Sequence, residues 1–339
     1  MTRSDWWDLR PFVTWIVDQY EPSVRVGPEV GAYASRPGGD DVELYGIADM
    51  ACVLHTIDRL RPTAAERDQW AASFARFRDP ATGHYVERGP ATHVELHVTA
   101  FTIAAMELVD ELVDAGAQHP LRFADAFRSP EQVTDVLDAL DWRDWVYLDS
   151  HRGAAIGAIA ANVPGLVDPA WFDAYFAALE RRLDPANGMF GDAKPPTGDL
   201  DQIGGAFHYA FLYEWAHRRL PHARARIDAV LGLQRADGTW DPANPFWLTL
   251  DGVYLLTRGV RHTGHRRAEV EQAVADSVDA VSRVALDGPS RSAAFAAPMG
   301  THALVAVVSL LAEAQSFLGD DRLVTDRPLR LVLDRRPFI

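Results

Sequence analysis

Cysteine is almost absent from this chain of 339 residues. Cys52 is the only one, so the chain cannot form an internal disulfide or assemble a zinc site from several thiolates. The absence of disulfides is typical of proteins in reducing compartments. We therefore expect a cytoplasmic protein.

Segments that would direct the chain to a membrane are also lacking. The N-terminus carries Trp6, Trp7 and two aspartates where a secretory signal needs a basic start and then an uninterrupted apolar run. No later stretch approaches the roughly 20 uncharged apolar residues that a membrane-spanning helix requires. The sequence predicts a soluble protein without membrane insertion.

Positive charge is scarce, because 33 Lys and Arg residues stand against 48 Asp and Glu residues, for a formal net charge of -15. A field of this sign repels nucleic-acid phosphates and anionic lipid surfaces. We therefore expect no nucleic-acid partner, and a small molecule or an oligosaccharide as the substrate. The sequence makes no prediction about oligomeric state.

Strand-like runs bounded by hairpin turns are missing, and helical periodicity takes their place. Some helical segments are apolar on most sides, which is typical of buried helices. These segments are 42–60, 93–112, 151–163, 200–219, 246–260 and 301–317. More amphipathic segments alternate with them, at 64–76, 130–140, 169–182, 222–234 and 268–286.

A turn phrase recurs at 78–85, 183–190 and, in a variant form, 234–240. Each copy combines Asp with Gly, and an aromatic residue follows. Such steps end helices because Gly accepts positive φ and Asp side chains bond nearby amides, while Pro in two of the copies fixes φ. The aromatic residues Tyr85, Phe190 and Trp240 are expected to pack as wedges between helical hairpins.

Buried helices recur at intervals of roughly 40 to 60 residues, a spacing typical of an array of helical hairpins. The sequence therefore predicts an all-α fold, an (α/α) toroid of about six helical hairpins. We expect one domain over residues 1–339. It would include an N-terminal helix and lead-in at 1–35 and a C-terminal strap across the surface at 327–339.

The beginnings of the predicted buried helices are rich in histidine and acidic residues. In a closed ring, these beginnings face one mouth of the central cavity. Helix capping explains Asp, Ser and Thr there, but not histidine, which needs a hydrogen-bond partner once buried and exchanges protons near neutral pH. For any single histidine, the alternative is a core residue with a satisfied hydrogen bond.

As a set, these side chains favour a catalytic site. The catalytic candidates are His93, His97, His151, His208 and Asp201. The candidates for substrate binding are Tyr45, Glu95, Arg152, Gln202, Tyr209, Trp247, Asp251 and His302. Aromatic residues among them can stack on sugar faces or stabilise a carbocation.

A metal site needs separate consideration, because His93 and His97 have the i, i+4 spacing of two zinc ligands. The string is His-Val-Glu-Leu-His rather than His-Glu-x-x-His, so Glu95 is displaced by one position, about 100° around the helix, and the zincin interpretation fails. A third ligand from His151, Asp201 or His208 would still complete a site. Our prediction is that the protein uses no metal and no cofactor.

The segment Leu233–Trp240, with Gln234 and Trp240, resembles the Gln-Trp repeat of the terpene cyclase and protein prenyltransferase toroid superfamily. In that superfamily the motif ties outer helices together. The resemblance covers about one hairpin strongly, and the two Asp-Pro phrases extend a weaker likeness over much of the chain. The motif is specific for a toroid and not for a reaction.

The chain departs from both families at their reactive residues. The Asp-x-Asp-Asp acid motif of class II terpene cyclases has no match, and Cys52 lacks the companions of a prenyltransferase zinc site. Similar toroids occur in sugar 2-epimerases, polysaccharide lyases and glycoside hydrolases, whose sites combine His, Tyr, acidic residues and aromatic rings. That mixture is nearer to this sequence.

We therefore expect a carbohydrate-active enzyme that acts on a sugar-like metabolite by His and acid proton transfer, as an epimerase, lyase or hydrolase. His208 with His151 or His97 would be acid and base, and Asp201 would orient them. One alternative is an isoprenoid cyclase or isomerase. The other is a non-catalytic toroid that binds a glycan or a partner protein.

Overall fold

The computed structural model describes residues 6–88, 93–109, 121–191, 198–243 and 245–338. These residues are mainly helical, which confirms the all-α prediction. Two short strands were not predicted: β1 (Trp7–Asp8) and β2 (Leu323–Val324) pair in parallel and join the two ends of the chain.

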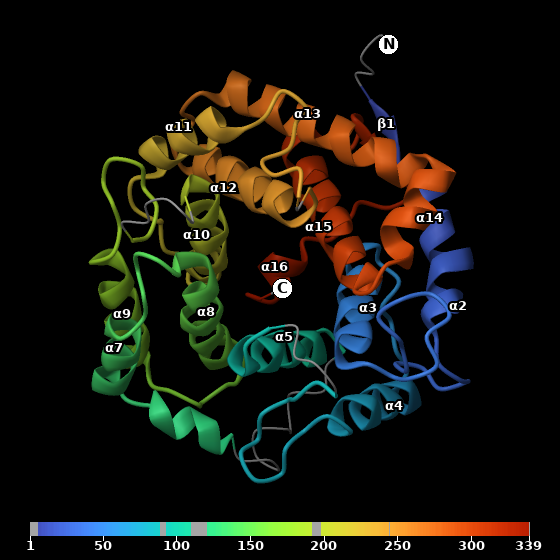
Figure 1. Ribbon diagram of the computed structural model, residues 1–339, viewed down its shortest axis with the longest axis horizontal. Coiled ribbons are helices and arrows are strands. Elements are labelled where there is room, and N and C mark those ends of the chain that lie inside the picture. The colour runs from blue at the N-terminus through green and yellow to red at the C-terminus, as the bar shows by residue number, and fades with distance from the viewer. Residues whose placement is uncertain (1–5, 89–92, 110–120, 192–197, 244, 339) are drawn as a thin grey trace.

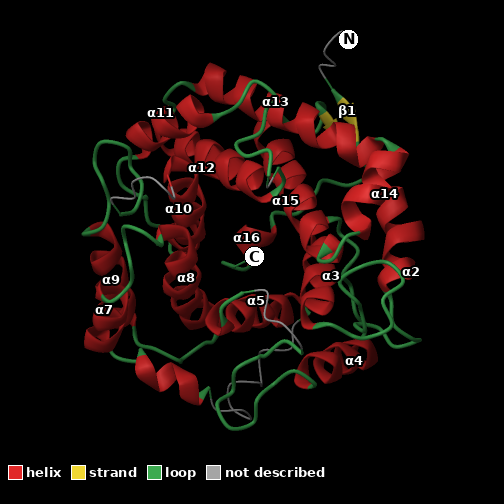
Figure 2. Cartoon of the chain, viewed as in Figure 1, coloured by secondary structure: helices red, strands yellow, loops and turns green. Residues whose placement is uncertain are grey.

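Long helices surround the centre of the molecule, as Figures 1 and 2 show. They are α3 (Leu44–Thr56), α5 (Glu95–Leu108), α8 (Val146–Asn162), α10 (Gly198–Trp215), α12 (Trp247–Thr263) and α15 (Gly300–Leu318). Each packs against the next along the chain, and α15 packs against α3, so the contacts form a closed cycle. Every predicted buried segment corresponds to one of these helices. The predicted end of the second segment, 110–112, lies outside the described residues.

Shorter or more amphipathic elements lie outside these helices (Figure 2). Along the chain they are α1 (Arg10–Trp15), the π-helical η1 (Ile16–Tyr20), α2 (Glu21–Val24), α4 (Ala64–Ala75), the 3-10 turn η2 (Arg122–Ala126), α7 (Pro130–Asp138), α9 (Pro169–Glu180), α11 (Ala223–Leu233), α13 (Arg267–Leu286) and α14 (Gly288–Ala296). Local sequence fixes several of their beginnings. Thr63 and Ser129 form capping boxes before α4 and α7, and Asp168 caps α9.

The recurring turn phrases have the backbone geometry that their glycines require. Gly83, Gly188 and Gly238 all have positive φ, at 87°, 69° and 88°. In each of the first two copies, the amide of the turn Asp donates to a carbonyl five residues later, and the amide of the Gly donates back to the Asp carbonyl. The aromatic residue that follows is buried in all three copies, as predicted.

The Gln-Trp segment links neighbouring helices. The side-chain amide of Gln234 donates to the Ala273 carbonyl over 2.9 Å and to Ser277 Oγ over 3.1 Å, and thereby ties the end of α11 to α13. The indole of Trp240 donates to the Val230 carbonyl over 2.9 Å. Its ring lies against Gly252 on α12, where an added Cβ would come within 2.7 Å of it. Trp240 is therefore a wedge between α11 and α12.

The sequence predicted that the C-terminal segment lies across the surface. In the structure, part of this segment is buried instead. After the short helix α16 (Val332–Arg335), drawn near the centre of Figure 1, Phe338 is fully buried. Its ring lies 4.9 Å from that of His97 and 5.7 Å from that of Phe211, centroid to centroid. Asp334 accepts a hydrogen bond from the buried Arg258 over 2.6 Å, which anchors α16 to α12.

Helix α15 is long and apolar enough to cross a membrane, contrary to the sequence expectation that no stretch approaches this limit. Its most apolar window is 78% buried, and the helix packs between α3 and α12. Its apolar character is therefore explained by its place in the core. This burial is compatible with a soluble protein.

Candidate functional site

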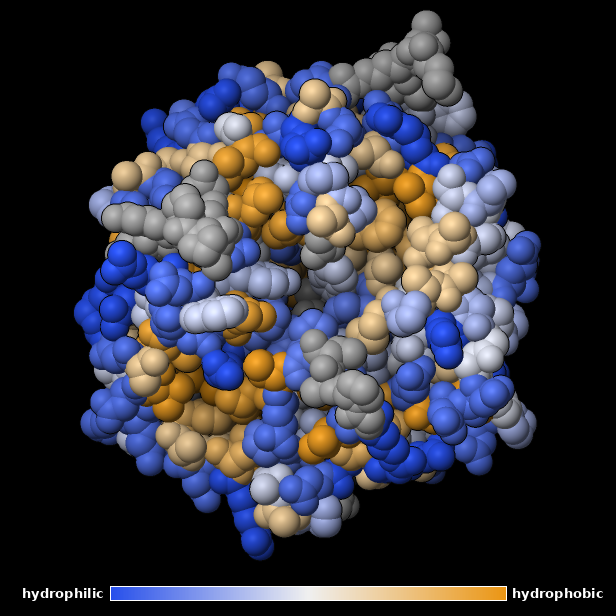
Figure 3. Space-filling model, in the orientation of Figure 1, coloured by the Kyte–Doolittle hydropathy of each residue, from blue (hydrophilic) through white to orange (hydrophobic). Residues whose placement is uncertain are grey.

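Imidazole rings from separate elements meet at the centre of the molecule. His97, His151, His208 and His302 come from α5, α8, α10 and α15, and His93 lies just before α5. Neighbouring ring centroids are 4.4 to 5.7 Å apart. We call these five residues the histidine cluster. The face drawn in Figure 3 is hollowed near its centre, over the middle of the helical cycle.

Several side chains of the cluster and its surroundings stand at the beginnings of inner helices. Tyr45 is the second residue of α3, His97 the third of α5, Trp247 the first of α12 and His302 the third of α15. Helix N-termini carry partial positive charge from unpaired amides. This partial charge adds to burial in disfavouring imidazolium and favours neutral imidazole.

Tyr45 connects two members of the cluster. Its hydroxyl lies 2.7 Å from His93 Nδ1 and 3.2 Å from His97 Nδ1, and the two imidazoles stack with an interplanar angle of 11°. A phenol has one hydrogen to donate, so it donates to one imidazole and accepts from the N–H of the other. The three side chains therefore form a continuous hydrogen-bonded chain.

His302 is held by an acid that the sequence reasoning missed. Its Nδ1 lies 2.8 Å from Asp49 Oδ1, and Thr301 donates to the other carboxylate oxygen over 2.7 Å. The ring of Trp247 lies 4.3 Å from that of His302 and is only partly buried. His302 and Asp49 form a His-Asp pair with an aromatic side chain beside it.

His208 is held by Ser150, which donates its hydroxyl hydrogen to the Tyr147 carbonyl and lies 2.9 Å from His208 Nδ1. His97, His151 and His208 each offer one ring nitrogen within 4.8 Å of the others, close enough for a shared metal ion after small side-chain rotations. His93, the fourth histidine predicted as a catalytic residue, is not in that group.

Burial sets the ionisation of these groups. Loss of solvation lowers the pKa of His93 to about 3 and that of His151 to about 4. The pKa values of His97 and His208 are also well below the usual range, with burial as the largest cause and neighbouring imidazoles as the next. The four rings are neutral at neutral pH and can accept protons or donate lone pairs.

The acidic residues respond to burial in the opposite direction. Burial raises the pKa of Asp49, although His302 and Thr301 oppose the change. Burial also raises the pKa of Asp251 well above the usual range. Its Oδ1 makes no hydrogen bond within the described part of the chain. Asp251 and Asp201 both lie close enough to Tyr147 to raise the pKa of its phenol, after the larger effect of burial.

Other predicted residues lie away from the cluster. Glu95 is exposed and faces His84, with 3.8 Å between His84 Nε2 and Glu95 Oε2. Arg152 is exposed and pairs with Asp149. Both lie on the outer side of their helices, because side chains one or two positions from an inward-facing histidine point in another direction.

Gln202 and Tyr209 point between inner and outer helices instead of into the centre. The amide of Gln202 contacts Asn187 in the second turn phrase and the carbonyl of Gly191 just after it. The ring of Tyr209 packs at 4.8 Å from Phe190 and 5.7 Å from Trp142. Both side chains therefore contribute to helix packing and lie outside the histidine cluster.

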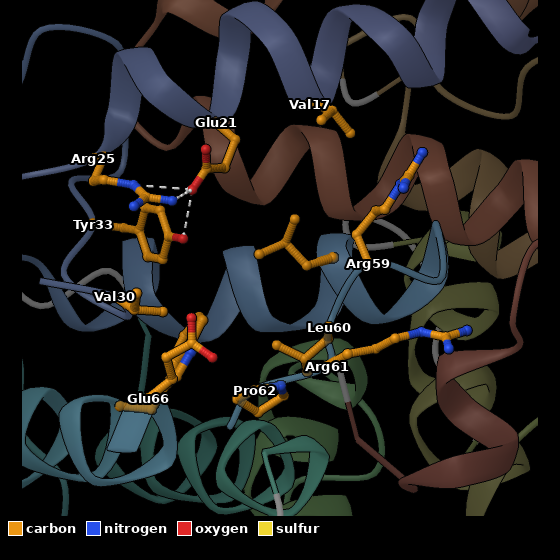
Figure 4. Close-up of a pocket in the computed structure, with 12 residues that line it drawn as sticks. Val17, Glu21, Arg25, Val30, Tyr33, Arg59, Leu60, Arg61, Pro62 and Glu66 are labelled. Atoms are coloured by element: carbon orange, nitrogen blue, oxygen red, sulfur yellow. Dashed lines mark hydrogen bonds and ion pairs between the residues drawn. The ribbon is translucent and has the colours of Figure 1, made fainter. Parts of the chain in front are cut away.

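The pockets described next lie outside the histidine cluster. One, of about 320 Å³, is lined by Asp41, Arg76, Arg88 and also by Tyr45, and therefore adjoins the cluster. The other, of about 350 Å³, lies between α2, α3 and α4 (Figure 4). In it Arg25 and Tyr33 converge on Glu21, with the Tyr33 hydroxyl donating over 2.7 Å. These polar groups satisfy one another.

No protein-family model matches this chain, and neither curated proteins nor solved structures give a match. The chain is an all-helical protein with repeated helical hairpins and a histidine-rich centre. Any narrower assignment depends on the geometry described above.

Proposed function

We propose that the chain is an (α/α) toroid enzyme that acts on a sugar-like metabolite by proton transfer. The toroid assignment is supported by the closed cycle of inner helices, by the outer helices around it and by the link that Gln234 makes between α11 and α13. The parallel beginnings of the inner helices support a site at one mouth of the cavity.

The observation that carries the enzymatic proposal is the His302–Asp49 pair. A carboxylate that accepts the Nδ1 hydrogen fixes the tautomer of the imidazole and leaves Nε2 able to accept a proton. Within the described residues, His302 makes no hydrogen bond other than the one with Asp49. His302 is therefore the general base in this proposal, and Asp49 positions it.

His93, linked to Tyr45, provides a second proton-transfer group opposite His302. The rings of His302 and His93 are 5.7 Å apart, and Tyr45 lies beside both, at 4.9 and 5.3 Å. One group can remove a proton from a substrate carbon or hydroxyl while the other returns a proton on another side. This division of roles suits an epimerase, lyase or hydrolase. It assigns the base to His302 instead of His208.

The substrate class follows from the surroundings of the pair. Trp247 offers a partly exposed indole beside His302, on which a sugar face can stack. The net charge of -15 disfavours highly phosphorylated compounds. An isoprenoid would need mainly apolar surroundings, whereas five imidazoles make the centre of this molecule polar. A neutral or weakly charged sugar is the best match.

The test is solvent exchange monitored by proton NMR in D2O, with a panel of aldoses, ketoses, amino sugars, uronic acids and oligosaccharides. We expect deuterium incorporation or a new product with at least one compound. His302→Gln and Asp49→Asn should lower the rate by about 100-fold or more while binding is retained. His265→Gln, a change at a peripheral histidine that pairs with Asp228, is the control.

Three results would contradict the proposal. If a sugar binds without exchange or product in the wild type, the chain is a binding protein. If His302→Gln turns over substrate as fast as His265→Gln, the base lies elsewhere. Binding restricted to prenyl diphosphates would favour the isoprenoid alternative.

A further inference from the structure

Three of the clustered histidines have the arrangement of metal ligands. His97, His151 and His208 come from consecutive inner helices, and each is at most 6% exposed. Their ring centroids are 4.7, 4.8 and 6.2 Å apart, and one nitrogen from each lies within 4.8 Å of the others. Packing three imidazoles this closely brings one nitrogen of each to a common position, where a shared cation would give their lone pairs a partner.

The hydrogen bonds around His208 fix which nitrogen is available. Ser150 has one hydroxyl hydrogen and donates it to the Tyr147 carbonyl. Ser150 can therefore only accept from His208 Nδ1, so this nitrogen carries the hydrogen. The lone pair of His208 is then on Nε2. This is how outer hydrogen-bond partners orient the histidine ligands of a metal ion.

His97 has the equivalent support from Tyr45. If His97 donates from Nδ1 to the Tyr45 oxygen, the phenol hydrogen is free to donate to His93 Nδ1, the shorter of the two contacts. The Nδ1 atoms of both histidines and the Tyr45 hydroxyl are then satisfied, and the Nε2 lone pair of His97 points away from Tyr45. His97 and His208 thus each have a hydroxyl partner on Nδ1. Their Nε2 atoms remain available for an ion shared by the three histidines.

The carboxyl group of Asp251 is buried next to the helix that carries His208. Asp251 Oδ1 has no hydrogen-bond partner in the described part of the structure, and its residue is 3% exposed. An added Cβ on Gly204 would lie 3.5 Å from Asp251 Oδ2, and Gly204 is one helical turn before His208. A cation bound to the three rings would reduce the cost of ionising this buried carboxyl group.

We propose that His97, His151 and His208 bind a divalent first-row transition metal ion of the zinc type. Three imidazole nitrogens without a carboxylate ligand favour such an ion over Mg²⁺ or Ca²⁺, which prefer oxygen. Three histidines at about 2.0–2.1 Å leave a fourth position open in a tetrahedral site. That position could hold a substrate oxygen or water. The proposal reverses our expectation from sequence that no metal is used.

The experiment measures metal uptake by the intact chain and needs no substrate. Protein treated with EDTA is titrated with ZnCl2 by calorimetry and with CoCl2 by visible spectroscopy. We expect one equivalent of Zn²⁺ per chain, and the intense visible bands of four-coordinate cobalt. His151→Gln and His208→Gln should each abolish stoichiometric binding, and His265→Gln should leave it unchanged.

Ser150→Ala keeps the test informative if the ligand variants do not fold. It removes only the hydroxyl partner of His208 and should weaken zinc binding by about 10- to 100-fold. Thermal unfolding of each metal-free variant identifies those that are folded. The proposal is overturned if the wild type takes up less than one equivalent of Zn²⁺. It also fails if folded His151→Gln and Ser150→Ala bind zinc as tightly as the wild type.

The metal site does not depend on the proposed proton transfer, and the two can fail separately. Metal uptake responds to His151, His208 and Ser150, whereas the proton-transfer proposal is tested at Asp49 and His302. Loss of zinc binding with retained solvent exchange would exclude only the metal site. Stoichiometric zinc binding without any exchange or product would exclude only the proton transfer.

Discussion

At the scale of single residues, His55 shows how burial changes side-chain chemistry away from the candidate site. It lies on α3 and is 4% exposed. Burial lowers its pKa from 6.5 to about 4, and the nearby Arg330, Arg335 and Arg336 lower it further in the same direction. The imidazole of His55 is therefore neutral in the folded chain at neutral pH.

This difference predicts a pH dependence of stability. Because the unfolded chain binds a proton at His55 near pH 6.5, before the folded chain does, stabilisation is complete above that pH and falls as the pH drops toward 4. The loss from this residue should reach about 3 kcal/mol. Urea unfolding between pH 7 and pH 4 should show a smaller decrease for His55→Gln than for the wild type. Superimposable profiles would contradict the assignment.

The residues of the site were predictable to different degrees. His302 could be identified because it stands at the start of a buried helix, but its partner Asp49 stands inside the apolar α3, 253 positions away in the chain. Glu95 and Arg152 could not be separated from true cluster members, because the sequence does not show which face of each helix turns toward the centre. Consecutive residues on a helix differ in direction by about 100°, so the rotation of the helix decides which of them reach the centre.

At the scale of elements, glycines allow the inner helices to approach their neighbours. An added Cβ on Gly153 of α8 would lie 2.2 Å from the Tyr209 hydroxyl on α10. By contrast, Gly232 on α11 has no atom within 4 Å of such a Cβ. Both are helical, so the gain in helix propensity on changing to Ala is similar.

The two glycines therefore form a matched pair for mutation. Gly153→Ala should lower the free energy of unfolding by about 1–3 kcal/mol, because Tyr209 must move from a packed position. Gly232→Ala should raise it by about 0.5–1 kcal/mol through helix propensity alone. Urea denaturation of both variants measures the difference. Similar effects for both would mean that α8 and α10 are not in close contact.

The elements themselves were largely predictable from sequence. Apolar residues on most sides marked each inner helix, and Asp and Gly marked the turns whose positive φ is observed. The start of α8 at Val146 rather than His151 was missed, as was α14. Strands β1 and β2 were missed because two residues carry no periodic pattern.

At the scale of the whole molecule, the C-terminal segment contributes to the wall of the central site. The buried Phe338 contacts both His97 on α5 and Phe211 on α10. Arg258 bonds Glu313 on α15 as well as Asp334 on α16, so this segment connects several inner helices. The end of the chain thereby supports one of the clustered histidines.

Removing the Phe338 ring should therefore be costly. Phe338→Ala is expected to lower the free energy of unfolding by about 3–5 kcal/mol, as for other fully buried phenylalanines. Phe317→Ala, at a partly buried phenylalanine near the end of α15, should cost about 1 kcal/mol. Chemical denaturation followed by circular dichroism gives both values. An equal cost at the two positions would show that Phe338 is not a core residue.

The sequence by itself determined the helical class, the alternation of buried and amphipathic helices and the turns between them. These features depend on local periodicity and on backbone preferences of Gly and Pro, which neighbouring residues control. It also marked the histidines at the helix starts. Only the tertiary structure decided that Asp49 pairs with His302, that Ser150 orients His208 and that Phe338 turns inward. These contacts join distant parts of the chain, so they depend on which helices become neighbours and how each is rotated about its axis.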